Sequence, residues 1–264
     1  MYRSWSVFWA LVLIAIGGLF LADQLSGGAF DAGAFIDRWW PLLIVGLGIA
    51  IMVEAAWPRR RPADVPLAID AAGASSAEIR IDFGAGRLEV GTAVSGRLLD
   101  GTLGGGGRVE QSGPGRVRLA ADVGDWWAGR WPGPGGLRWR VGISPEVPVA
   151  LRVATGASDN TLDLSGLRVT HLDLHAGASE TRVVLPRAAG ATTVRVEAGA
   201  AAVRLRVPEG VAARIAGTMA LGAAHVDTRR FGWAGTGWIS PDWASAANRV
   251  DVVFQGGIGG IYVE

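Results

Sequence analysis

The residues from Thr170 to Pro208 carry the pattern that decides the fold: THLDLHAGASETRVVLP over 170–186 and TVRVEAGAAAVRLRVP over 193–208. Each half alternates apolar and polar residues, passes through a corner of small residues, alternates again and ends at a proline. Alternation with a period of two is typical of strands that bury one face. The stretch therefore predicts two successive strand–corner–strand units.

The same unit recurs before and after this stretch. Its corners are centred on glycines, and from Gly156 onward the spacings are 21, 22, 23 and 35 residues. Repeats of about 20 to 50 residues are typical of solenoids, and crossovers between parallel strands are almost always right-handed. We therefore expect residues 67–264 to form an all-β soluble domain, a right-handed parallel β-solenoid (β-helix), with Ile261–Glu264 offering an open edge. The corner glycines are Gly86, Gly156, Gly177, Gly199, Gly222 and Gly257.

Two glycine- and tryptophan-rich stretches interrupt the repeat, one between Gly86 and Gly156 and the other over 231–243. We expect both to be loops that leave the stack. Their tryptophans have two interpretations. They cap the apolar ends of the stack, which we favour, or they form a docking patch, since exposed aromatic side chains are typical of interfaces. The candidates are Trp126, Trp127, Trp131, Trp233, Trp238 and Trp243, with Trp139 beside them.

The first 57 residues predict a transmembrane hairpin. Residues 5–22 carry no charge, and residues 39–57 are interrupted only by Glu54. At about 1.5 Å per residue, such runs are long enough to cross a hydrocarbon core of about 30 Å. A cleaved signal peptide is the alternative for the first run, but the run is long for one and a second run follows at once. A proline-rich linker over 58–66 follows the hairpin.

The charges around the two runs predict their orientation. Arg59, Arg60 and Arg61 follow the second run, whereas the loop 23–38 holds three aspartates and one arginine. Because basic residues stay on the cytoplasmic side, we expect a multi-pass protein of the plasma membrane whose C-terminal domain is cytoplasmic. Glu54 lies near the end of its run, where it can reach the interface or pair with the following arginines.

Composition and motifs exclude several classes of site. The 264 residues include no cysteine, and the net charge is +1 without a basic block, so thiol chemistry and nucleic-acid binding are not expected. His171 and His175 are four apart on a strand, about 13 Å, which is too far to share a metal. An aspartate ladder for calcium lacks the dense repeat that such sites use. The members of that ladder would be Asp159, Asp163 and Asp173. From the sequence as a whole, we expect no catalytic, cofactor-binding or metal site.

The chain resembles LiaF-like envelope-stress proteins with a toast-rack domain (cell-wall-active antibiotics response). The resemblance lies in FWALVLIAIGGLFL over 8–21 and WWPLLIVGLG over 39–48 for the transmembrane region, and in VPVALRVATGAS over 147–158 for the β-domain. It implies a bacterial, non-enzymatic membrane regulator or scaffold that acts through protein–protein contacts, some members restraining a sensor histidine kinase. This chain has two predicted membrane spans, whereas better-known members of the family have four.

We therefore expect the partners to be the lipid bilayer and an envelope or signalling protein, with a homo-oligomer as a further option. Two alternatives stay open. One is a structural protein whose β-domains assemble with one another at the membrane. The other is a carbohydrate-active β-helix enzyme, which usually carries a line of acidic residues that this sequence does not show.

Overall fold

The computed structural model describes residues 63–121, 136–188 and 190–264, and these residues form one sheet of 14 strands without a helix. The expectation of an all-β domain is confirmed for this part of the chain. The strands are β1 (Val65–Asp70), β2 (Ala77–Thr92), β3 (Arg97–Gly104), β4 (Arg108–Gln111), β5 (Arg116–Ala120), β6 (Leu137–Ile143), β7 (Val149–Asp163), β8 (Val169–Ala176), β9 (Glu180–Val184), β10 (Ala191–Arg206), β11 (Ala212–Val226), β12 (Gly232–Trp233), β13 (Gly237–Ile239) and β14 (Arg249–Val263).

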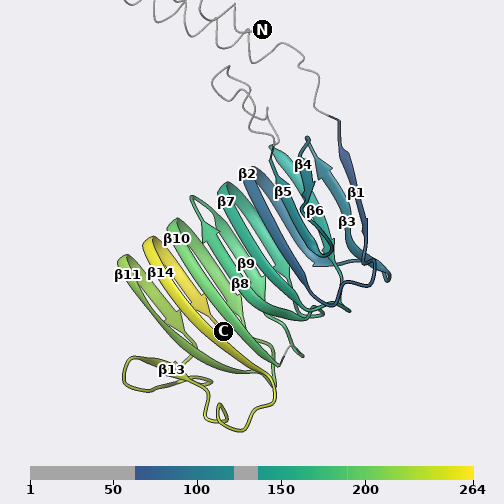
Figure 1. Cartoon of the computed structure of the whole chain (residues 1–264). Coiled ribbons are helices and arrows are strands. Elements are labelled where there is room, and N and C mark those ends of the chain that lie inside the picture. Colours follow the sequence, from purple (N-terminus) through teal and green to yellow (C-terminus); the bar gives the residue numbers. More distant parts are fainter. Residues whose placement is uncertain (1–62, 122–135, 189) are drawn as a thin grey trace, which may run out of the picture. The chain divides into compact units, whose positions relative to one another are not determined.

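Five long strands, β2, β7, β10, β11 and β14, carry the sheet. Each bends at its small-residue corner, which gives it a first arm before the corner and a second arm after it (Figure 1). The short strands β8 and β9 together fill one such place. β10 pairs with β8 over Thr193–Ala198 and with β9 over Ala202–Arg206. The alternating pattern of the sequence thus produced bent strands that pair in parallel.

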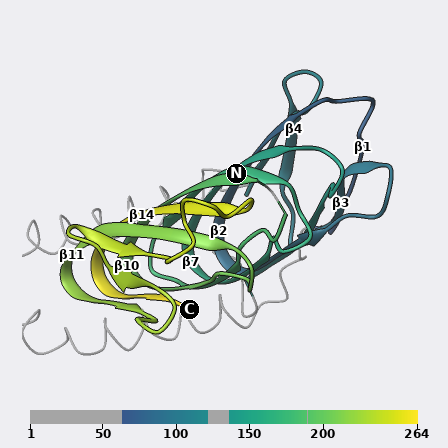
Figure 2. The ribbon, with the colours of Figure 1, turned by 90° about the horizontal axis from the view of Figure 1, so that it is seen from below.

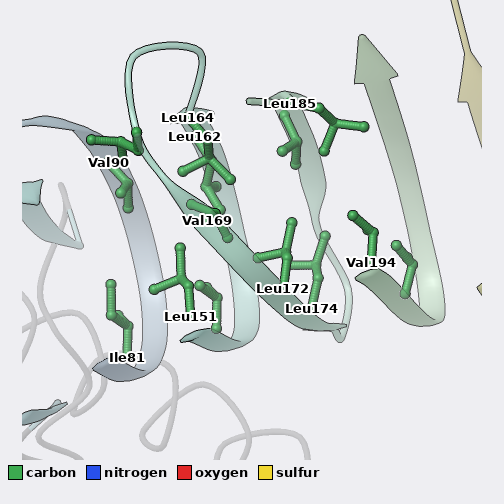
Figure 3. Close-up of a cluster of buried hydrophobic side chains, with 14 of the residues drawn as sticks. Ile81, Val90, Leu151, Leu162, Leu164, Val169, Leu172, Leu174, Leu185 and Val194 are labelled. Atoms are coloured by element: carbon green, nitrogen blue, oxygen red, sulfur yellow. The ribbon is translucent and has the colours of Figure 1, made fainter. Parts of the chain in front are cut away.

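The apolar residues of both arms meet in the interior. Ile81 and Val90 come from the two arms of β2, and Leu151 and Leu162 come from the same places in β7 (Figure 3). None of the four is more than 3% exposed. Burying a side chain of this size contributes about 1.5–3 kcal/mol, so the column of Ile, Leu and Val between the arms is the main source of stability.

Glycine is needed at the corners because neighbouring backbones approach closely there. A Cβ atom at Gly156 would lie 2.5 Å from the carbonyl oxygen of Gly84, and one at Gly257 would lie 2.7 Å from that of Gly199. In register, the corner of β2 that matches Gly156 is Gly84, not Gly86. The choice of Gly86 as the repeat position was therefore wrong by two residues. The choice of Gly222 was wrong in the same way, because its partner in β14 is Gly259 and not Gly257.

A regular solenoid is not confirmed, because the strands do not follow one another in chain order. β14 pairs in parallel with β10 on one side and with β11 on the other. Figure 1 shows β11, β14, β10, β7 and β2 in succession from left to right. The expectation that Ile261–Glu264 offers an open edge is wrong, since Ile261, Tyr262 and Val263 lie between Val203–Leu205 and Ala224–Val226.

The two interruptions of the repeat contain strands as well as loops. The first holds β3 to β6, of which β3 pairs antiparallel with both β1 and β6. The second holds β12 and β13, and β13 pairs with Arg214–Ala216 of β11. Viewed from below, β11, β10 and β14 lie toward one end and β1, β3 and β4 toward the other (Figure 2). The sheet thus acquires antiparallel strands at both ends, which the repeat pattern does not contain.

Several sequence-based predictions concern residues outside the described part. These are both helices of the hairpin, the signal-peptide alternative, and Arg59, Arg60 and Arg61. β1 begins at Val65, two residues before the predicted start of the domain, so Val65 and Pro66 belong to a strand rather than to the linker. Among the described residues, no helix is long and apolar enough to cross a membrane.

Candidate interaction surface

The candidate tryptophans occupy very different environments. Trp126, Trp127 and Trp131 lie outside the described residues. Trp139 stands in β6 and is 1% exposed, with its indole N–H donating to the Gly106 carbonyl oxygen at 3.1 Å. It also meets the ring of Phe83 edge-on, with 5.2 Å between ring centroids. Trp139 therefore closes the core beneath the β3–β4 turn.

Trp233, Trp238 and Trp243 belong to the second interruption. Trp233 and Trp238 face each other across the β12–β13 pair, with their ring centroids 4.9 Å apart. Trp238 packs against the core, whereas Trp233 is 63% exposed. Trp243 is half-buried beneath the guanidinium of Arg214, which lies 5.2 Å from its ring centroid. Among the three, Trp238 thus contacts the core, and Trp233 is a surface residue.

A groove of about 1050 Å³ runs across the outer face of the first arms. Its lining comes from seven of the 14 strands, β4, β5, β2, β7, β8, β10 and β14. The corner glycines Gly84, Gly177, Gly199 and Gly257 form part of it. Because glycine has no side chain, the row of corners leaves a trough that residues on either side border.

Charged side chains of both signs border one end of the groove. The Asp82 carboxylate accepts hydrogen bonds from Arg118 Nε at 2.7 Å and from Arg80 Nε at 2.9 Å. Burial alone would raise the pKa of Asp82, but these hydrogen bonds outweigh it and hold the pKa below its ordinary value of 3.8. Asp82 is therefore ionised at neutral pH and fixed in place by two guanidinium groups.

A second pair lies further along the groove. His175 Nδ1 of β8 is 3.0 Å from Glu197 Oε2 of β10, and Gln255 of β14 also lines the groove. Asp82, His175, Glu197 and Gln255 all stand two residues before the corner glycine of their strand. Such a row can contact an extended ligand at several points, each with a different polar group.

The remaining polar candidates of the sequence pair with their neighbours. Asp159 lies 3.5 Å from Arg87 and 3.4 Å from Arg182, and Asp173 lies 3.1 Å from Arg152. The Asp163 carboxylate accepts a 2.6 Å hydrogen bond from the Ser165 hydroxyl. His171 contacts only Thr170 among the interactions resolved, at 3.2 Å. No three His, Asp or Glu side chains of the described residues gather as metal ligands would.

Two comparisons with protein families match this chain. The family described as the N-terminal domain of toast_rack, DUF2154, matches residues 62–206, which is more than half of the chain. The chain belongs to the toast_rack family. The LiaI-LiaF-like transmembrane region matches residues 7–52. The protein is therefore a LiaF-like membrane protein with a toast-rack domain, and the resemblance found in the sequence is confirmed.

A solved structure shares the fold of the toast-rack domain. It is the crystal structure of a "putative cell adhesion protein" from Clostridium sporogenes ATCC 15579, with a TM-score of 0.61 and 15% sequence identity. The match covers 76% of this chain and 98% of the other. None of the curated proteins compared with the chain matches it. At this identity the similarity concerns the fold alone.

The sequence-based search missed the groove of the toast-rack domain. Its signal is the polar residue two positions before the corner glycine in β2, β8, β10 and β14, where β7 has Ala154, but only the register brings these residues into one row. The search also missed a buried polar cluster in β7. Asn160 is fully buried, and its Nδ2 donates to Thr181 Oγ1 at 2.9 Å. Its Oδ1 and the hydroxyl of Ser158 have no hydrogen-bond partner among the described residues.

Proposed function

We propose that this toast-rack protein is a membrane-anchored, non-enzymatic regulator or scaffold of the cell-envelope stress response, and that it binds an extended segment of a partner protein along the groove. The groove carries the proposal, because it crosses seven of the 14 strands and is bordered by charged groups of both signs. A sensor histidine kinase of the same membrane is the partner class that the LiaF resemblance implies.

The state of the charged groups supports binding rather than catalysis. Asp82 is held by two arginines with a lowered pKa, so its carboxylate is a poor proton donor at neutral pH. His175 and Glu197 pair with each other across two strands. Fixed pairs of this kind give direction and specificity to a contact more than they give affinity.

Reversing one charge of the groove is expected to abolish capture of the partner. In membranes solubilised with mild detergent, Glu197→Arg should lower recovery of the co-purified partner at least about tenfold. The substitution removes the pair between Glu197 and His175, and a ligand group that faced the carboxylate would then face a positive charge. Glu209→Arg is the matched control, because Glu209 is also exposed but lies outside the groove lining. Equal loss in both variants, or no envelope or signalling protein captured by the unchanged chain, would count against the proposal.

We further propose two membrane spans with the toast-rack domain in the cytoplasm. The run Arg59–Arg61 after the second predicted span supports this orientation. A reporter enzyme fused after Glu264 should then be active only if it functions in the cytoplasm. Activity of an exported reporter at the same position would place the domain on the opposite side and remove a cytoplasmic kinase domain as its ligand.

A structural protein that assembles with copies of itself at the membrane is the second candidate function. The open edge of β11 favours it, because no described strand pairs with Gly217–Val226 on the side away from β14. The description of the structural neighbour as a "putative cell adhesion protein" is compatible with this candidate. The two functions differ in what the full-length protein binds, which is another protein in the first case and its own copy in the second.

A further inference from the structure

β11 from Gly217 onward is a sheet edge that no described strand covers. β13 covers only Arg214–Ala216 of this strand, and the following ten residues, Gly217–Val226, pair with β14 alone among the described strands. From Ile215 to Val226 the sequence IAGTMALGAAHV contains no Asp, Glu, Lys or Arg. Natural sheets usually protect an edge of this length with charges, proline or a bulge.

The other edges of the described sheet carry such protection. β1 has six residues and includes Pro66 and Asp70, whereas β4 has four residues and includes Arg108 and Glu110. β12 has only two residues. The β11 edge is thus the longest among the described strands, and no other described edge longer than two residues is free of charge, which indicates that something covers it.

The apolar interior is also open at this edge. Ala224 and Val226 are half-buried, while their neighbours in β14, Ile261 and Val263, are 0% and 2% exposed. At the corner, Leu221 is 69% exposed beside Ile258, which is 61% exposed. Covering the edge would therefore remove apolar side chains from water as well as satisfy backbone groups.

The free stretch is complementary to itself. If a second β11 lies antiparallel beside it, with the two-fold axis between Leu221 and Gly222, Gly217 stands opposite Val226 and Met219 stands opposite Ala224. Met219, Ala224 and Val226 all pack toward the core, so the pairing keeps core-facing residues opposite one another. This two-fold axis also lies at the bend of β11, next to Gly222, whose φ is 150°. A bent strand that is rotated by 180° about an axis at its bend keeps the same bent shape, so the two copies can lie side by side.

The ends of the stretch fit the same arrangement. The paired residues begin at Gly217, directly after the last residue that β13 covers, and they finish at Val226, the last residue of β11. We propose that two copies of this toast-rack domain associate through β11, forming a two-fold symmetric sheet that continues across both copies. This interface deepens the second candidate function and does not depend on the groove.

A single introduced cysteine tests the arrangement, because the chain has none of its own. In the proposed pairing, the two Leu221 Cα atoms lie diagonally across the axis, about 6 Å apart given a strand spacing of about 4.8 Å and a rise of about 3.4 Å. A disulfide accepts this separation. In full-length protein in its membrane, Leu221→Cys should form a disulfide-linked dimer under mild oxidation.

Val94→Cys is the matched control, since Val94 is 71% exposed and lies between β2 and β3, away from the β11 edge. It should stay monomeric. Two further variants combine Leu221→Cys with a glutamate. One carries Ala223→Glu on the β11 edge, and the other carries Ala202→Glu in β10, where both alanines stand opposite Gly260 of β14. Only Ala223→Glu should lower the dimer fraction, by several-fold, because it places charge on the paired edge.

Four results would overturn the proposal. They are the absence of a Leu221→Cys dimer, equal cross-linking of the Val94→Cys control, cross-linking of Leu221→Cys to a different protein, and equal effects of the two glutamates. None of these results bears on the groove, because the capture experiment with Glu197→Arg measures a different surface. The two proposals can therefore fail separately.

Discussion

Trp139→Ala should destabilise the toast-rack domain by about 3–5 kcal/mol, the range for removing a fully buried aromatic side chain. Three losses add up at this site. The indole no longer fills the core beneath the β3–β4 turn, its N–H no longer satisfies the Gly106 carbonyl at 3.1 Å, and Phe83 loses its edge-on contact. Denaturant unfolding of the full chain in detergent, followed by far-ultraviolet circular dichroism, measures the change.

Trp233→Ala is the matched control, because it removes the same side chain from a position that is 63% exposed. Its effect should stay within about 1 kcal/mol, which covers its contact with Trp238. Trp139→Phe keeps much of the ring but loses the indole N–H, and should lie between the two. Similar losses for Trp139→Ala and Trp233→Ala would show that burial does not distinguish these positions.

The contrast between these tryptophans shows where sequence reasoning stops. Both stand in glycine-rich surroundings, and the pattern gives them the same expectation of a loop. Trp139 is buried because β6 pairs with β2 over Gly86–Thr92 and with β3 over Leu99–Gly104. These pairings join segments that are far apart in the sequence, so no local signal distinguishes Trp139 from Trp233.

The local sequence pattern was sufficient to predict the strands that pair with other copies of the same repeat unit. The alternation within 170–208 predicted strands that the structure has as β8, β9 and β10, with a corner at Gly177 and another at Gly199. The order of the units could not be read in this way. β11 and β14 carry the same strand–corner–strand pattern, so nothing in either indicates that the later strand lies between β10 and the earlier one.

That order determines which surfaces are available for binding. Because β14 lies inside the sheet, its exposed Ile258 stands next to the exposed Leu221 of β11, and the apolar surface gathers at one edge. The groove depends on register in a similar way. His175 reaches Glu197 because β8 and β10 are in parallel register at these two residues. Both candidate surfaces thus arise from strand pairing, not from a local motif.

The second large effect is expected at the corner of β14. Gly259 has a φ of 130°, and a Cβ atom there would lie 2.1 Å from the carbonyl oxygen of Ala201. Gly259→Ala should therefore cost at least about 3 kcal/mol, from a strained backbone and a contact that only movement of β10 against β14 relieves. Thermal unfolding of the full chain in detergent would measure this loss as a lower midpoint.

Gly210→Ala separates the two causes. Gly210 also has a positive φ, 77°, but a Cβ atom there would meet nothing within 4 Å. Its cost should be about 1–2 kcal/mol, from the backbone alone. The difference between the two variants then measures how tightly β10 and β14 approach. If both variants lost the same stability, the two strands could separate at the corner without cost, and close backbone contact would not be the reason for glycine at position 259.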